Sequence, residues 1–201
     1  MRVRLSAFLL AMVLAVGSPA VAWAGAAEAT VQSFSAVLLD VMKNGPALGF
    51  TGRSAKLRQP VADLFDMTSM TKSTLGAGAA KLSPEESAKL TETYLAFSVA
   101  TYAAQFDEWE GERFEVGDQR PSTGGAVIIP SWIIPKTGDS TEIDYVMRES
   151  NGAWRVVDVL YDGSVSQVAV RRSEFVSIFR AKGIAGLIET IEKQTAALGK
   201  K

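Results

Sequence analysis

The sequence of 201 residues is 47% hydrophobic and 21% charged, which is typical of a chain that folds around one substantial core. Its formal net charge is -1, so the chain lacks the surplus of basic residues that is typical of nucleic-acid-binding proteins. The sequence contains no histidine and no cysteine, which excludes Ser-His-Asp and Cys-His catalysis, disulfide bonds, and metal sites built from imidazole or thiolate ligands.

The first 24 residues have the pattern of a secretory signal peptide. Arg2 and Arg4 precede the apolar run LSAFLLAMVLAV, and small residues follow as far as Ala24. We predict cleavage after Ala24, with Ala27 as the second choice, and a mature domain of residues 25–201 in the periplasm. The apolar run is shorter than the roughly 20 residues of a membrane-spanning helix, so we expect no stable membrane insertion.

Three helices are predicted before residue 82. Residues 28–43 place apolar side chains at helical spacing, and the Asn-Gly-Pro that follows ends the helix. A glycine-containing connector, ALGFTGR, leads to a short helix over residues 54–65. Asp66 is expected to cap a third helix, which Gly76 ends.

The segment 82–111 gives the clearest helix prediction in the sequence, with a capping box of Ser83 and Glu86 at its start. It carries two apolar stripes rather than one. The first comprises Leu95, Val99, Tyr102, Phe106 and Trp109, and the second comprises Leu90, Tyr94, Phe97 and Thr101. One buried face needs only one stripe, so the helix either lines an apolar space beside the core or lies between two protein layers.

From residue 112 the hydrophobic period changes to two, which predicts four strands within residues 112–121, 123–135, 140–149 and 153–163. Their short connections favour an antiparallel meander. Ser164 and Gln167 are expected to cap a C-terminal helix that is interrupted at Gly183. The predicted fold class is therefore α+β, with N-terminal helices, a curved four-stranded antiparallel sheet and C-terminal helices.

Residues 154–190, WRVVDVLYDGSVSQVAVRRSEFVSIFRAKGIAGLIETI, resemble the MlaC/toluene-tolerance family of periplasmic lipid-binding proteins. Earlier stretches, among them LGFTGR, FDMTSMTKSTLG and GERFEV, are similar to the HpnM branch, which is associated with hopanoid genes. The resemblance covers about residues 30 to 193. It implies a cone-shaped sheet of the nuclear-transport-factor type, with helices around an apolar pocket.

The resemblance also implies a function without enzymatic activity, metal or cofactor. The protein is expected to be an auxiliary component of an ABC transporter that carries a hopanoid or a phospholipid between an inner-membrane transporter and an outer-membrane complex. Nine residues are predicted to line the lipid pocket: Tyr94, Phe97, Tyr102, Trp132, Ile134, Tyr145, Val165, Val168 and Phe179. Four arginines are expected either at the pocket mouth or on a solvated helix face: Arg155, Arg171, Arg172 and Arg180.

Two alternatives remain open from the sequence. One is an interaction module that docks on a membrane complex and has no pocket. The other is an isomerase-like enzyme, in which Asp158 or Asp144 acts as a base and Tyr145 polarises an oxyanion. Against the enzyme, Asp158 is expected to accept hydrogen bonds from a turn, or to pair with Arg155 or Arg172.

Overall fold

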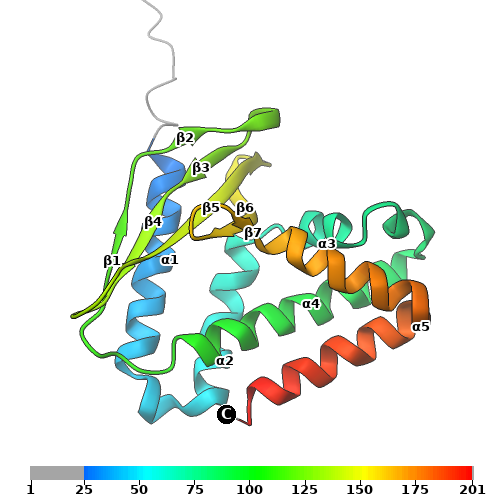
Figure 1. Ribbon diagram of the computed structural model, residues 1–201, viewed down its shortest axis with the longest axis horizontal. Helices are drawn as coiled ribbons and strands as arrows, with labels where there is room; N and C mark the ends of the chain where they lie inside the picture. Colours follow the sequence, from blue (N-terminus) through cyan, green and yellow to red (C-terminus); the bar gives the residue numbers. More distant parts are fainter. Residues whose placement is uncertain (1–24, 201) are drawn as a thin grey trace, which may run out of the picture.

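A computed structural model describes residues 25–200, so the predicted signal peptide lies outside the described residues. The described chain forms five α-helices, two 3-10 helices and a seven-stranded antiparallel sheet, which confirms the α+β class (Figure 1). The α-helices are α1 (Ala26–Lys43), α2 (Gly45–Leu64), α3 (Met67–Leu75), α4 (Pro84–Gln105) and α5 (Gln167–Leu198). The 3-10 helices are η2 (Gly76–Lys81) and η3 (Thr123–Gly125).

The strands are β1 (Arg113–Val116), β2 (Arg120–Pro121), β3 (Val127–Ile129), β4 (Ser131–Ile134), β5 (Thr141–Ser150), β6 (Ala153–Tyr161) and β7 (Val165–Ser166). The sheet order is β1-β4-β5-β3-β2, and β6 pairs with both β5 and β7. The predicted count of four strands is wrong, because the first two predicted strands are each divided and β7 follows the fourth as an additional strand. Pro130 has no N–H to donate and separates β3 from β4, although both pair with β5. The cone shape of the sheet stays a prediction.

Helices α3 and α4 start at their predicted caps. The Asp66 carboxylate accepts a hydrogen bond of 2.9 Å from the backbone N–H of Ser69, and Ser83 and Glu86 form the capping box of α4. The α5 cap is a correction: Ser166 rather than Ser164 accepts from the N–H of Ala169, at 2.9 Å. The predicted connector before residue 54 is also corrected, because this segment is helical in α2 except at Gly49.

Helix α4 ends at Gln105, six residues before the predicted end. The segment that follows, FDEWEG, carries three carboxylates. Negative side chains are unfavourable at a helix C-terminus, where the macrodipole is already negative. Trp109 therefore leaves the helical stripe and lies 44% exposed in a loop, where the Lys43 ammonium sits 5.0 Å from its ring centre.

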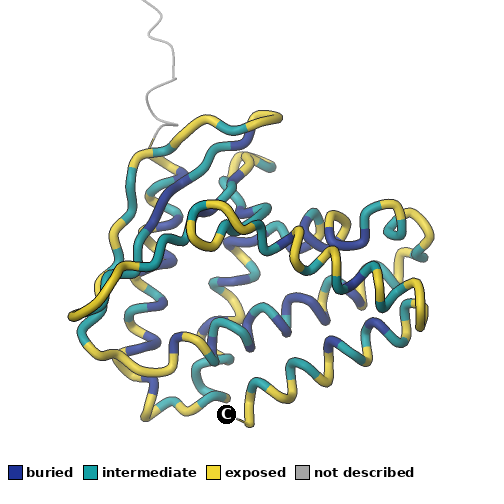
Figure 2. The backbone as a smooth tube through the Cα atoms, viewed as in Figure 1, coloured by how far each residue is buried: buried dark blue, intermediate teal, exposed yellow. Residues whose placement is uncertain are grey.

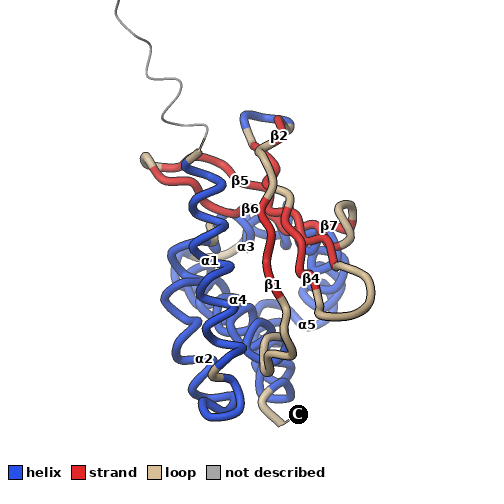
Figure 3. Tube along the Cα trace, turned by 90° about the vertical axis from the view of Figure 1, so that its left-hand side faces the viewer, coloured by secondary structure: helices blue, strands red, loops and turns tan. Residues whose placement is uncertain are grey.

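The helices form a layer beside the sheet. Helix α4 packs against α2 and α5, and α1 packs against β1 (Figure 3). Buried residues follow the inner sides of α1, α2 and α4, where Leu38, Leu57 and Leu90 are fully enclosed (Figure 2). The junction of α2 and α3 is fixed to the sheet, because the N–H of Asp66 donates to the Val156 carbonyl at 2.9 Å. No helix within residues 25–200 is long and apolar enough to cross a membrane.

Candidate functional site

A cavity of about 690 Å³ lies between α4 and the face of the sheet that looks toward the helices. Its walls are mainly apolar, and its volume is in the range of small-molecule binding sites. Helix α4 contributes Tyr94, Phe97, Ser98, Thr101, Tyr102 and Gln105. The sheet contributes Phe114, Ser131, Ile133, Thr141, Ile143, Tyr145, Val159 and Tyr161. Gln167 and Arg171 come from α5, and Met42, Phe65, Met70 and Phe106 complete the apolar wall.

An aromatic cluster forms the inner part of the wall. The ring of Tyr102 stacks on Phe106 at 5.7 Å and meets Phe34 edge-on at 5.3 Å. Burial raises the pKa of Tyr102 and of its hydrogen-bonding partner Tyr145 above the ordinary tyrosine value. Burial also raises the pKa of Tyr94 to about 12, although the nearby Arg171 acts in the opposite direction. These phenols are uncharged near neutral pH and supply no general base.

Four of the nine predicted pocket residues line this cavity: Tyr94, Phe97, Tyr102 and Tyr145. Trp132 and Ile134 do not, because Ser131 and Ile133 take the cavity side of β4 and successive strand residues point to opposite faces. Val165 is 47% exposed on β7. Val168 packs in the core, and Phe179 lies against Gly78 of η2.

The sequence interpretation missed the polar rim of the cavity. Asp107, Glu108, Glu110 and Glu112 line it from the loop between α4 and β1. The hydrophobic pattern extends the preceding helix over most of this segment, so it does not predict that these carboxylates meet the sheet. The charge of this segment is the one signal in the sequence that the helix ends earlier. Several carboxylates close together are unfavourable at the negative C-terminal end of a helix dipole.

The two carboxylates of the isomerase alternative do not meet in the cavity. Asp158 accepts hydrogen bonds from the Ser166 hydroxyl and from the backbone N–H groups of Val159 and Val168, at 2.8 and 3.0 Å for the two amides. It therefore fixes the turn from β6 into α5, as expected for a structural carboxylate. Of the two alternatives expected for Asp158, the structure has the hydrogen bonds from the turn. Within residues 25–200 it has no ion pair of Asp158 with Arg155 or Arg172.

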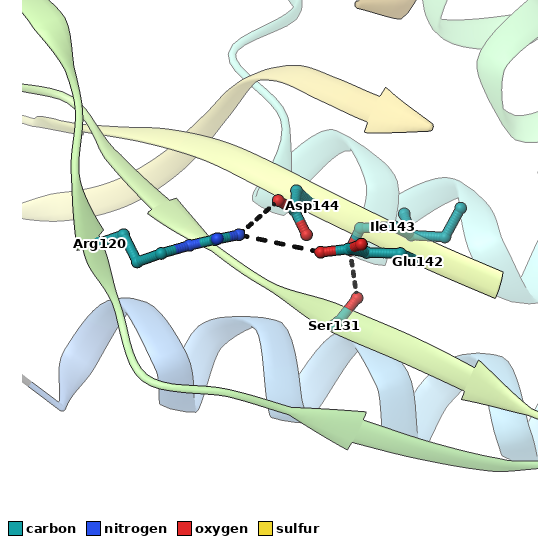
Figure 4. Close-up of polar contacts among 5 residues, drawn as sticks. All are labelled: Arg120, Ser131, Glu142, Ile143 and Asp144. Carbon is teal, nitrogen blue, oxygen red and sulfur yellow. Dashed lines mark hydrogen bonds and ion pairs between the residues drawn. The ribbon is translucent and has the colours of Figure 1, made fainter. Parts of the chain in front are cut away.

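Asp144 is buried on the sheet face away from the cavity, where Arg120 reaches over it from β2 (Figure 4). An Nη2 atom of Arg120 lies 2.8 Å from Oδ2 of Asp144 and 3.9 Å from the Glu142 carboxylate. Burial is the main cause of a raised Asp144 pKa, and the nearby Glu142 acts in the same direction. The Arg120 guanidinium opposes both effects, so this carboxylate depends on its cation.

Replacing Arg120 with methionine is expected to lower the free energy of unfolding by about 2 kcal/mol, because a buried carboxylate loses its partner. The further change Asp144→Asn removes the stranded charge and should recover most of the loss. The loss should also shrink at acidic pH: the raised pKa means that the folded state takes up the proton first as pH falls, and protonated Asp144 needs no cation.

Urea unfolding of the single and double variants measures this coupling. Arg113→Met is the matched control, because Arg113 pairs with Glu115 at 3.2 Å and both side chains are more than half exposed. Its effect should stay below about 0.5 kcal/mol. A double variant no more stable than Arg120→Met would contradict the stated role of the pair.

Only one of the four predicted mouth arginines lines the cavity. The Arg171 guanidinium lies 4.7 Å from the centre of the Phe97 ring and forms a 2.9 Å ion pair with Glu174. Arg172 lies against Gly76, and Arg180 is exposed on α5. Arg155 donates to the carbonyls at the C-terminal end of α2, with a 2.6 Å hydrogen bond to Asp63.

The arrangement is suited to binding an apolar ligand. The lining hydroxyls of Ser98, Thr101 and Ser131 each donate to a backbone carbonyl. Residues 25–200 hold no cluster of three or more potential metal-ligating side chains. An interaction module without a pocket does not fit a chain with a cavity of this size. The uncharged aromatic wall is the kind of surface that buries an apolar ligand.

Comparison with known proteins supports this interpretation of the fold. The profile of the MlaC protein family matches residues 32–193. Among solved structures, the phospholipid-binding protein from Ralstonia solanacearum, determined in complex with a phospholipid, superposes with a TM-score of 0.75 at 19% sequence identity. The match covers 86% of this chain and 98% of that one. Comparison with curated proteins gave no match.

Proposed function

The chain belongs to the MlaC family, and on that premise we propose that it is a non-enzymatic lipid carrier of the periplasm. The observation that carries the proposal is the cavity of about 690 Å³ with an aromatic wall from α4 and an apolar wall from the sheet. The phospholipid complex of a protein with the same fold supports it. The lining residues Tyr94, Phe97, Tyr102 and Tyr145 are proposed to contact the lipid.

The energetics favour exchange between membranes over capture from water. Burying about 30 CH₂ groups of a phospholipid yields about 24 kcal/mol gross, at roughly 0.8 kcal/mol each. This exceeds the ceiling of roughly 18–21 kcal/mol for non-covalent affinity. A lipid already dissolved in a bilayer gains little more by moving into the cavity. The proposed cycle therefore loads at an inner-membrane transporter and unloads at an outer-membrane complex, or the reverse.

The cargo is proposed to be a phospholipid or a hopanoid. The fold match supports the first, and the resemblance to the HpnM branch supports the second. A hopanoid is a rigid fused-ring lipid, so binding orders few rotors, and its flat faces suit aromatic walls such as Tyr94 and Phe97. A phospholipid loses more chain entropy but brings a charged head group.

Native mass spectrometry of the protein purified from the periplasm of its own host tests these proposals together. We expect a mature chain that begins at Gly25 and a bound lipid whose mass identifies the cargo. Cleavage after Ala27 would remove a residue that is fully buried in α1, which favours the earlier site. A mass that retains residues 1–24 would contradict export with cleavage. Protein that is always free of lipid would contradict the carrier.

A further inference from the structure

The mouth of the cavity carries an excess of negative charge. Asp107, Glu108, Glu110 and Glu112, here called the acidic rim, all line the cavity from one short loop. None of the four forms an ion pair with any residue of the described chain. Of the neighbouring cations, Lys43 lies over the Trp109 ring, and the aliphatic part of Lys136 lies close to Gly111 in the loop of the acidic rim.

The cation of the cavity does not offset the acidic rim. Arg171 is the one basic residue of the lining within residues 25–200, and its guanidinium is paired with Glu174 at 2.9 Å. Glu174 is held in turn by the side-chain amide of Gln194. The positive charge is thus neutralised inside the protein before any ligand arrives. A lipid that enters the cavity meets an apolar wall and a mouth whose four carboxylates form no ion pair within residues 25–200.

The loop that carries the acidic rim is held in place through its backbone and through the Glu112 side chain. The Glu112 carboxylate accepts a 2.7 Å hydrogen bond from the backbone N–H of Glu110, and the Trp109 indole donates to the Glu112 carbonyl at 2.9 Å. The backbone carbonyl of Asp107 packs directly on Gly45 at the start of α2. Fixed charges at the edge of a low-dielectric cavity act more strongly on a ligand than freely moving surface charges do.

We infer that the cavity selects its lipid by head-group charge, and that the acidic rim favours a head group with an ammonium over an anionic one on the same chains. The inference rests on the proposed lipid carrier and deepens it. A zwitterionic phosphoethanolamine head places its ammonium within reach of the rim carboxylates, whereas a phosphoglycerol head brings only a negative charge to them. Both carry the same phosphate, so the ammonium decides the difference.

The experiment offers the mature protein vesicles with equal amounts of phosphatidylethanolamine and phosphatidylglycerol that have identical acyl chains. Bound lipid is extracted after separation and quantified by mass spectrometry. We expect the bound ratio to favour phosphatidylethanolamine about tenfold at low salt. The preference should fall markedly at about 0.5 M NaCl, because exposed charges are screened over a few ångströms there.

The triple variant Asp107→Asn, Glu108→Gln, Glu110→Gln tests the acidic rim itself and should bring the ratio close to one. The matched control, Glu85→Gln, Glu149→Gln, Glu189→Gln, removes three exposed carboxylates outside the cavity lining and should keep the preference. Equal loading of both lipids by the unmodified protein, or a preference that the triple variant retains, overturns the inference while lipid binding stands. Failure to take up either phospholipid overturns the phospholipid cargo and the inference together, while the hopanoid cargo of the proposed carrier stands.

Discussion

Replacing Ser98 with tryptophan is expected to reduce the lipid bound by this protein at least about tenfold. Ser98 lies in the middle of α4, is half-buried and faces the cavity between Phe97 and Thr101. Its side chain bonds only to the Tyr94 carbonyl of its own helix, at 2.9 Å, so little structure depends on it. An indole at this point occupies space that the acyl chains or rings of a lipid would need.

The fold should survive this change because the new side chain enters an existing void rather than a filled core. Thermal unfolding should show a stability within about 1 kcal/mol of the unmodified protein. Ser177→Trp is the matched control, since Ser177 is exposed on α5 and outside the lining. It should bind lipid normally. If Ser98→Trp is stably folded and still carries a full complement of lipid, the lipid does not occupy this cavity.

Replacing Gly45 with alanine is expected to destabilise the protein by about 3 kcal/mol. A Cβ atom on Gly45 would lie 1.8 Å from the backbone carbonyl oxygen of Asp107 and 2.7 Å from its carbonyl carbon. Backbone atoms cannot rotate away as a side chain can, so the start of α2 and the loop after α4 must separate. Arg53 joins the same two places, with hydrogen bonds to the carbonyls of Ala103 and Gly45 at 2.8 and 3.0 Å.

Chemical denaturation of Gly45→Ala measures the loss, and Gly25→Ala is its control. Gly25 precedes α1, and a methyl group on its Cα would have no atom within 4 Å beyond its chain neighbours, so that change should cost little. Because the loop after α4 carries the acidic rim, Gly45→Ala should also weaken any head-group preference in the fraction that stays folded. Equal stability of the two variants would show that the loop moves aside without cost.

The local signals in the sequence predict the helices well and the sheet register poorly. Capping groups such as Asp66 and Ser83 act within one helical turn, so their pattern is complete in the sequence. The side of β4 that faces the cavity depends on the break at Pro130 and on pairing with β5, which lies several residues further along the chain. A shift of one residue exchanges the two faces, which is why the sequence pattern favours Trp132 as a pocket residue and overlooks Ser131.

The residues of the candidate site also differ in how far the sequence predicts them. Tyr94 and Phe97 lie on the second apolar stripe of α4 and Tyr102 on the first. Both stripes are visible in the sequence, so these three lining residues are predictable. The prediction of Val165, Val168 and Phe179 assumes a closing helix, and only the tertiary packing of α5 shows that Gln167 and Arg171 take that position. The acidic rim can be predicted only if the end of α4 is known. That end depends on the balance between helix propensity and the helix dipole, which a hydrophobic pattern does not contain.

The raised pKa values of the buried tyrosines have a consequence for how cargo can be released. Proton linkage drives unloading only when binding changes the number of protons held by the protein. With their raised pKa values, the phenols of Tyr94, Tyr102 and Tyr145 keep their protons well above neutral pH, and the sequence has no histidine. Near neutrality, a change of pH therefore does not alter this wall. In the proposed carrier cycle, we therefore expect release to depend on a receiving partner that binds one shape of the cavity more tightly than another.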